Sequence, residues 1–159
     1  MMNVGRSLVG ISLSEVLEAR TILEVEMAGL AAQRAGDDDL RAIEQNLQRM
    51  ASRTKEHEAL FVTVDADFHA LVAKSARNRI LAEFLLQVYG YLRPELHRVL
   101  EEEGAVERSL FYHRAIYDAL RSRDVAEARR RMSLHMADIR ARMMELRDSL
   151  PVAGGASDD

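Results

Sequence analysis

The sequence predicts an all-α fold, an antiparallel bundle of about six helices. Apolar residues recur about every three to four positions along almost the whole chain, which is the spacing of one face of an α-helix. No segment alternates between apolar and polar residues over a useful length, and β-branched residues do not cluster, so strands are not expected. With 159 residues, 48% of them hydrophobic, the chain is long enough to bury one core.

The first two predicted helices meet at a glycine. Ser12 or Ser14 caps the first helix, which ends at Gly36 because glycine suits a helix C-terminus. The acidic residues 37–39 then cap a second helix, which ends near Arg53.

Four further helices follow, and the fourth contains a proline. The third helix covers about residues 56–76, and the fourth begins near Arg77. Pro94 lacks an amide proton and therefore removes one helical hydrogen bond, so a bend in the fourth helix is expected there, which need not end the helix. The fifth helix follows Gly104, and Asp124 caps the sixth. The short connections between these helices favour antiparallel neighbours.

The two ends of the chain and its charge define the expected domain. Residues 1–11 are predicted to be a linker or an expression remnant, residues 12–150 the folded domain, and residues 151–159 a flexible tail. The formal charge is −4 with basic residues scattered, so no nucleic-acid surface is expected, and no segment suits a signal peptide or a membrane span. A soluble cytoplasmic protein is the expectation. Because there is no cysteine, disulfides and thiolate metal sites are excluded.

Four polar residues fall on or beside apolar faces and suggest a metal site. Asp65 and His69 are four positions apart, so both project from one face of the third helix. His113 and His135 lie inside the apolar stripes of the last two helices. A buried carboxylate needs a cation or several hydrogen-bond donors, and one divalent metal would explain all four placements together.

Each of these residues also has a simpler interpretation. A single histidine on an apolar face is more often a core residue with satisfied ring nitrogens, and this applies to His113 or His135 taken alone. Asp65 and His69 could form a surface pair at helical spacing. His57 and His97 do not fall on the apolar face of a predicted helix and are expected to be exposed to solvent.

Arg20 is a charged residue in the apolar stripe of the first helix. It could form an internal ion pair with Glu24, which lies one turn further on. It could equally receive an anionic ligand, because a guanidinium matches a carboxylate through a forked pair of hydrogen bonds. The sequence leaves both roles open.

Three segments of the sequence stand out: EARTILEVEMAGLAAQRA, DADFHALVAKSARN with a D-x-x-F-H pattern, and HRAIYDALRSRDVAEARRRMSLH. Together they resemble the FCD family, the C-terminal effector-binding domain of FadR-subfamily regulators in the GntR superfamily, which has the same D-x-x-F-H pattern. The resemblance implies a divalent metal bound by Asp65, His69, His113 and His135, with zinc the first expectation and nickel, manganese, iron or cobalt as alternatives. It also implies a small carboxylate-bearing effector near Arg20 and Asn78, and a homodimer.

The chain departs from the full-length family pattern in two respects. Regulators of this family carry a winged helix-turn-helix domain, whereas only about ten linker-like residues precede the first predicted helix here. We therefore expect this chain to contact DNA only through a domain that it lacks. Tyr112 also stands where the family commonly has Glu, beside the histidine of the fifth helix.

These observations favour an effector-sensing and dimerisation domain of a transcriptional regulator, and not an enzyme. A metal-dependent enzyme on a helical bundle is the alternative, but no H-E-x-x-H motif is present and no Glu lies three positions before a histidine. A metal-free helical dimerisation module is the third hypothesis. In that case the histidine ring nitrogens would form hydrogen bonds within the chain, and the apolar surface not needed for the core would form the dimer interface.

Overall fold

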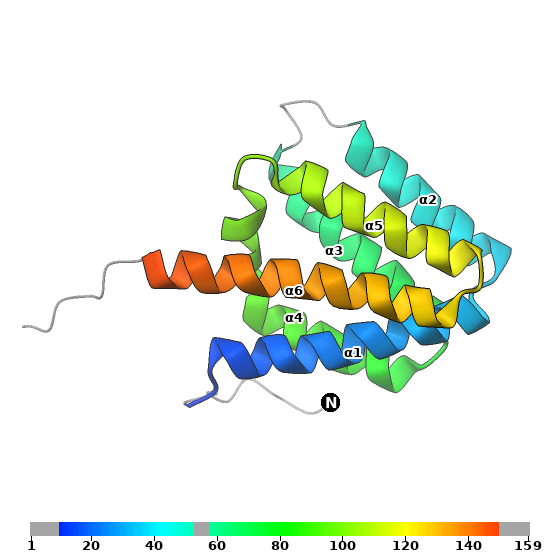
Figure 1. Cartoon of the computed structure of the whole chain (residues 1–159), viewed down its shortest axis with the longest axis horizontal. Helices are drawn as coiled ribbons and strands as arrows, with labels where there is room; N and C mark the ends of the chain where they lie inside the picture. The colour runs from blue at the N-terminus through cyan, green and yellow to red at the C-terminus, as the bar shows by residue number, and fades with distance from the viewer. Residues whose placement is uncertain (1–9, 53–57, 150–159) are drawn as a thin grey trace, which may run out of the picture.

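In the computed structural model, which describes residues 10–52 and 58–149 and the side chains of all of these except 58–60, six helices form an antiparallel bundle (Figure 1). They are α1 (Leu13–Arg34), α2 (Asp37–Ala51), α3 (Glu58–Ser75), α4 (Arg79–Leu100), α5 (Ala105–Arg121) and α6 (Val125–Ser149). The described residues contain no strand, so the predicted all-α class and helix number are confirmed.

Capping residues explain most of the helix starts. The Ser12 hydroxyl accepts from the Glu15 amide and the Glu15 carboxylate accepts from the Ser12 amide, which is a complete capping box. The Asp124 carboxylate accepts from the amide of Glu127 at 2.9 Å and caps α6 as expected. The Asp39 carboxylate accepts from the amide of Gly36 at 2.9 Å, so the acidic start of α2 is also confirmed.

Two predicted boundaries differ from the structure. The first helix ends at Arg34, and Gly36 has φ −88° and forms the N-cap of α2, so it does not end α1 in a left-handed conformation. The fourth helix begins at Arg79 rather than Arg77, because Asn78 acts as its N-cap. The predicted end near Arg53 and start at residue 56, like most of the two terminal segments, lie outside the described residues.

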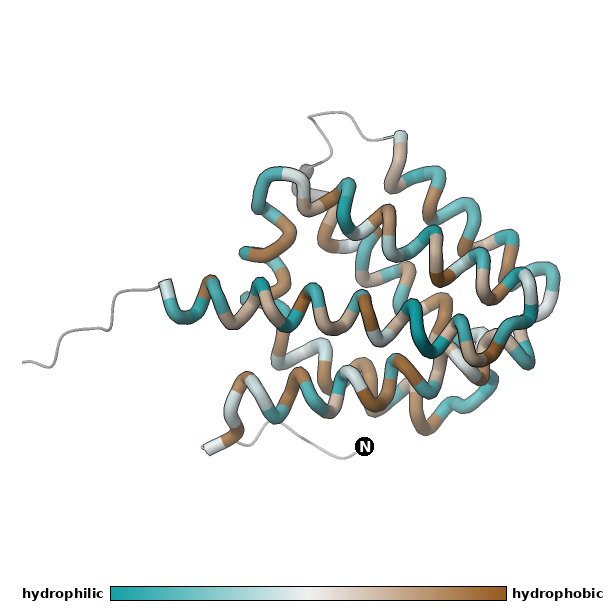
Figure 2. Tube along the Cα trace, in the orientation of Figure 1, coloured by the Kyte–Doolittle hydropathy of each residue, from teal (hydrophilic) through white to brown (hydrophobic). Residues whose placement is uncertain are grey.

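Pro94 does not end α4, which continues to Leu100. Figure 1 shows that the later part of α4 runs in a different direction from its first part, in agreement with the predicted bend. Figure 2 shows hydrophobic segments recurring turn by turn along the helices rather than filling any one of them. In the described part of the chain, no helix is both long and apolar enough to cross a membrane.

Helices α1 and α3, which carry residues of the candidate site, each contact most of the bundle. Helix α1 contacts α3, α4, α5 and α6, and α3 contacts α1, α2, α4 and α5. The largest apolar cluster joins α1, α2, α3, α5 and α6 and includes Phe68, Ile116 and Met132. Polar side chains on α1, α3, α5 and α6 are buried next to this core.

Candidate metal centre

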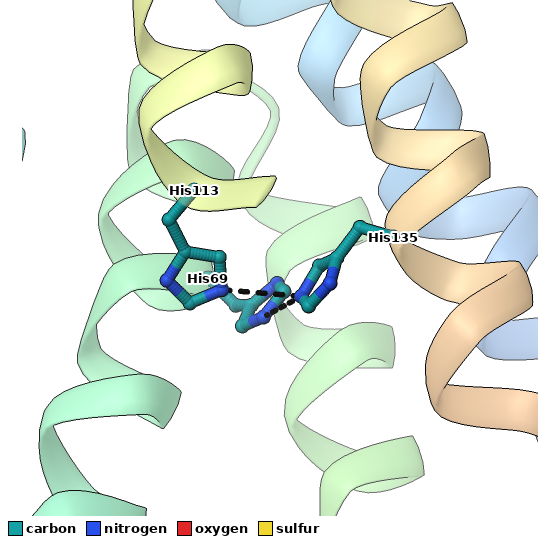
Figure 3. Close-up of side chains that lie close together, drawn as sticks. All are labelled: His69, His113 and His135. Carbon is teal, nitrogen blue, oxygen red and sulfur yellow. Dashed lines mark hydrogen bonds between the residues drawn. The ribbon is translucent and has the colours of Figure 1, made fainter. Parts of the chain in front are cut away.

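Four predicted ligand residues come from three different helices. Asp65 and His69 lie one turn apart on α3, His113 lies on α5, and His135 lies on α6. Their exposed fractions are 3%, 1%, 0% and 1%. Figure 3 shows the three imidazole rings pointing toward one another from their separate helices.

The histidine nitrogens converge on one point. The Nε2 atom of His135 lies 3.1 Å from Nε2 of His113 and 3.3 Å from Nε2 of His69. One ligand atom from each of the three histidines lies within 4.8 Å of the others. Nitrogen atoms that bind one zinc ion tetrahedrally at 2.0–2.1 Å are about 3.4 Å apart, so the observed spacing suits a shared metal.

Asp65 is close enough to complete this group. Its Oδ1 atom lies 3.7 Å from Nε2 of His113, too far for a hydrogen bond, and it has no hydrogen-bond partner among the described residues. Burial raises the pKa of the Asp65 carboxyl, and the opposing effects of His69, Arg20 and a hydrogen bond with Ser109 do not cancel it. A cation beside Oδ1 would satisfy this atom and favour its charged form.

Two of the three histidines, His113 and His135, favour the neutral form that metals require. Burial, followed by the neighbouring histidines and Arg20, lowers the pKa of His113 well below its usual value. Burial, His69 and Arg20 likewise lower the pKa of His135. Neutral imidazoles keep a lone pair for coordination, so the donor set and its protonation state fit a borderline divalent metal.

Neighbouring side chains fix two of the rings. Nδ1 of His69 lies 2.5 Å from a carboxylate oxygen of Glu24, a contact that orients the ring with Nε2 toward the other two histidines. The Phe68 ring stacks on His113 with centroids 3.8 Å apart and an interplanar angle of 6°. The orientation of the His69 and His113 rings is therefore fixed by the protein itself, without a bound metal.

Arg20 lies beside this centre in a buried polar network. Its Nε atom donates to Glu24 Oε1 at 2.9 Å, and its Nη2 atom donates to the Tyr89 hydroxyl at 2.8 Å. The Tyr89 hydroxyl in turn donates to Glu24 Oε1 at 3.0 Å. The predicted internal ion pair is present, but Nη1 of Arg20 is buried without a partner among the described residues, so the ligand-binding role also stays open.

Glu24 joins the two parts of the site, and its charge is held firmly. Burial alone would raise its pKa, but His69 and Arg20 outweigh burial and hold the pKa of Glu24 well below its usual value. The sequence indicated Glu24 as a partner for Arg20 but gave no sign of its contact with His69. Tyr89 was missed, because a tyrosine beside an apolar stripe has no distinctive pattern.

Asn78 and two histidines lie away from the centre or outside the described residues. The Asn78 side chain accepts from the Leu81 amide at 3.2 Å as the cap of α4, and it lines a cavity of about 570 Å³ that Tyr89 also borders. Its predicted contact with an effector stays a prediction. His97 is half-exposed and lies 3.0 Å from Glu101. His57 lies outside the described residues.

A second cavity, of about 340 Å³, lies between α3 and α4 and reaches Asp65. It shares Asp67, Leu86 and Tyr89 with the cavity at Asn78, so the two are adjacent. An all-α bundle with a buried ligand set, an arginine beside it and a cavity reaching it has the features of a small-molecule-binding regulatory domain.

The chain belongs to the FCD domain family, whose model matches residues 15–138. This is the effector-binding regulatory domain found in GntR-family transcriptional regulators. The predicted resemblance is confirmed.

Several similar proteins are transcriptional regulators by name. The galactonate operon transcriptional repressor of Escherichia coli K12 is 28% identical over 135 residues, which are 84% of this chain and 58% of that protein. The uncharacterised regulator YcbG of Bacillus subtilis is 27% identical over 137 residues, covering 84% and 55%. The chain thus spans a little over half the length of these relatives. None of these names describes an enzyme, in agreement with the prediction of a regulatory domain.

Two solved structures share the fold. Streptococcus agalactiae GntR matches with a TM-score of 0.68 and 25% identity over 80% of this chain and 57% of that one. E. coli McbR/YncC matches with a TM-score of 0.72 and 19% identity over 85% and 65%, a similarity that concerns the fold alone.

Proposed function

We propose that this chain is the effector-sensing and dimerisation domain of a FadR-type regulator of the GntR family. In this proposal Asp65, His69, His113 and His135 bind a divalent transition metal, with zinc the first candidate. A small carboxylate-bearing metabolite binds beside it and controls an attached winged helix-turn-helix domain in the cytoplasm. DNA contacts belong to that attached domain, and this chain contacts neither DNA nor a membrane.

The observation that carries the proposal is the convergence of three buried imidazoles on one point with an unsatisfied carboxylate oxygen beside it. The Nε2 atom of His135 lies 3.1 Å from that of His113 and 3.3 Å from that of His69, which is close enough for the three nitrogens to share one metal ion. Leaving buried polar atoms unpaired is costly, and three of the four residues, Asp65, His113 and His135, have such an atom, which favours a ligand at this place over an internal structural role.

The residues around this point suit an organic anion. A bound divalent ion would supply positive charge and, if its coordination exceeds four, open positions for a carboxylate oxygen. Arg20 is buried with a free Nη1 donor, and its guanidinium can bind the second oxygen of a carboxylate. An anion at Arg20 would compete for the contacts that Arg20 now makes with Glu24 and Tyr89.

Glu24 provides a physical link between the two ligands. One of its oxygens binds Arg20 and the other binds His69. A change in the Arg20 contact therefore alters the partner that orients a metal ligand. Arg20 and Glu24 lie on α1, His69 on α3 and Tyr89 on α4. Anion binding would therefore bias the packing of these three helices and, in a homodimer, the spacing of the attached DNA-binding domains.

Metal content tests the first part of the proposal. Protein purified without a metal-affinity column should hold about one metal ion per chain by elemental analysis, whereas a His113→Ala, His135→Ala double variant should hold none. His97→Ala is the matched control, because His97 is half-exposed and lies away from the centre. Full occupancy in the double variant would contradict the metal site, and a metal-free wild type would favour the plain dimerisation module.

Calorimetry of carboxylates tests the second part. Galactonate is the first probe, because one relative is named as a galactonate operon repressor. Binding to metal-loaded protein should weaken at least tenfold after removal of the metal or in Arg20→Met, which keeps the apolar stem. Binding unaffected by both changes would contradict the proposed effector site.

A further inference from the structure

The cavity of about 340 Å³ between α3 and α4, here called the Gly90 cavity, has one wall at the candidate centre and one at the surface. Asp65 forms its inner wall and is almost fully buried, whereas Gly90 and Arg93 in its outer wall are exposed. Tyr89 also lines it and covers Arg20 through a hydrogen bond. The volume is within the range of cavities that hold small molecules.

Gly90 is unexplained by the packing of this chain. It lies inside α4, where glycine weakens a helix relative to alanine. A Cβ atom at this position would meet nothing within 4 Å, and its φ is not positive. By contrast, a Cβ at Gly29 would come 2.7 Å from the Arg129 side chain. Glycine at position 90 therefore leaves open space at the cavity wall, and no neighbouring atom requires the missing side chain.

The charges around the Gly90 cavity depend on the candidate centre. Asp65, Asp67 and Arg93 are the charged residues that line it. Asp67 lies 3.9 Å from Arg49, whereas Arg93 forms no ion pair with any side chain that the structure describes. With a divalent cation on Asp65, the inner wall would become positive, and Arg93 would extend that positive potential to the surface.

We propose that the Gly90 cavity is the entrance through which an organic anion reaches the centre, and that Gly90 and Arg93 determine which anions enter. The empty space at Gly90 limits the size of the anion, and the unpaired Arg93 attracts it. This inference rests on the proposed function, because it requires an anion that binds beside the metal.

Variants at position 90 test the entrance. The probes are acetate and citrate, mixed with cobalt-loaded protein while the visible absorption of cobalt is followed. Gly90→Trp should slow citrate association at least tenfold and change acetate association less than twofold. Gly90→Ala should behave as wild type. Gln87→Trp is the matched control, because Gln87 is exposed on the same helix and lines neither cavity between α3 and α4.

The outcomes separate the two proposals. If citrate binds the wild type and Gly90→Trp at equal rates, the proposal that the Gly90 cavity is the entrance is wrong, although the proposed function stands. If neither acid alters the cobalt spectrum of the wild type, the effector proposal fails, and the entrance for an anion fails with it. A second measurement is the rate at which the chelator dipicolinate removes cobalt from the protein. Gly90→Trp should lower this rate at least fivefold. An equal rate in both proteins would also contradict the entrance.

Arg93 is tested by charge reversal. Arg93→Glu should slow citrate association about tenfold at low ionic strength, and the difference should shrink toward twofold in 1 M salt, because salt screens exposed charges. Arg98→Glu is the control, since Arg98 is exposed on α4 but lines neither of these cavities. Equal slowing by the two variants would indicate a general effect of net charge and would contradict the role of Arg93.

Discussion

Two groups of polar side chains are buried next to each other in the bundle, and they differ in how well their atoms are satisfied. Arg20, Glu24 and Tyr89 bind one another at 2.8 to 3.0 Å and leave one guanidinium nitrogen free. In the second group, Oδ1 of Asp65 and the Nδ1 atoms of His113 and His135 have no hydrogen-bond partner among the described residues. Equal burial therefore accompanies two different arrangements: a hydrogen-bonded scaffold in the first group, and in the second a carboxylate oxygen without a partner beside histidine Nε2 atoms that could hold a metal.

Removal of Glu24 should have the largest effect. Glu24→Ala leaves the buried Arg20 charge without its main partner and should lower the free energy of unfolding of metal-free protein by about 3–5 kcal/mol. Urea denaturation measures this change. Glu26→Ala is the matched control, because Glu26 is exposed and pairs with Arg129 at the surface, where about 0–1 kcal/mol is expected. Similar losses in both variants would remove the distinction between the scaffold and an ordinary surface pair.

A metal bound by Oδ1 of Asp65 and the Nε2 atoms of the histidines should stabilise the protein. At a free zinc concentration about 100 times the Kd, the free energy of unfolding should rise by about 2.7 kcal/mol. The measurement is urea denaturation with and without zinc. Asp65→Ala should lose most of this gain, whereas His97→Ala should keep it. An equal gain in Asp65→Ala would exclude Asp65 from the ligand set.

Acidification should destabilise the metal-free protein through the second group. The folded-state pKa values of His113 and His135 are lowered, so below about pH 6.5 the unfolded chain binds protons that the folded chain does not. Stability should therefore be fully present above pH 6.5 and fall as the pH drops, by about 1.4 kcal/mol per pH unit for each histidine.

Asp65 acts in the opposite direction, because its pKa is raised in the folded state and it takes up a proton there first. Denaturation curves at several pH values measure the net slope. His135→Leu should have a shallower slope than wild type, since one titrating group is removed. Equal slopes would show that His135 does not resist protonation in the folded protein.

Replacement of one unsatisfied histidine should have the smallest effect on the metal-free protein. His135→Leu exchanges a buried, poorly satisfied side chain for an apolar one of similar size, so the free energy of unfolding should change by less than about 1.5 kcal/mol. The same variant should lose the stabilisation by zinc. A loss as large as that of Glu24→Ala would show that His135 belongs to the scaffold.

Local signals were sufficient for most of the helices. The capping pairs at Ser12 and Asp124 and the apolar periodicity defined starts that the structure confirms. Gly36 was assigned the wrong role, because glycine suits either end of a helix and only the observed φ distinguishes them. Asp65 and His69 could be placed on one helix face from their spacing alone.

The helical class, and the choice of Asp65, His69, His113 and His135 as candidate ligands, follow from the sequence, because periodicity, capping and motif spacing are properties of nearby positions. Only the tertiary structure brought His113 and His135 to His69, gave Glu24 its contact with His69 and placed Tyr89 over Arg20. Those contacts join residues up to 69 positions apart, and they depend on how α1, α3, α4, α5 and α6 pack. The packing is a collective result of core burial, which no local pattern specifies.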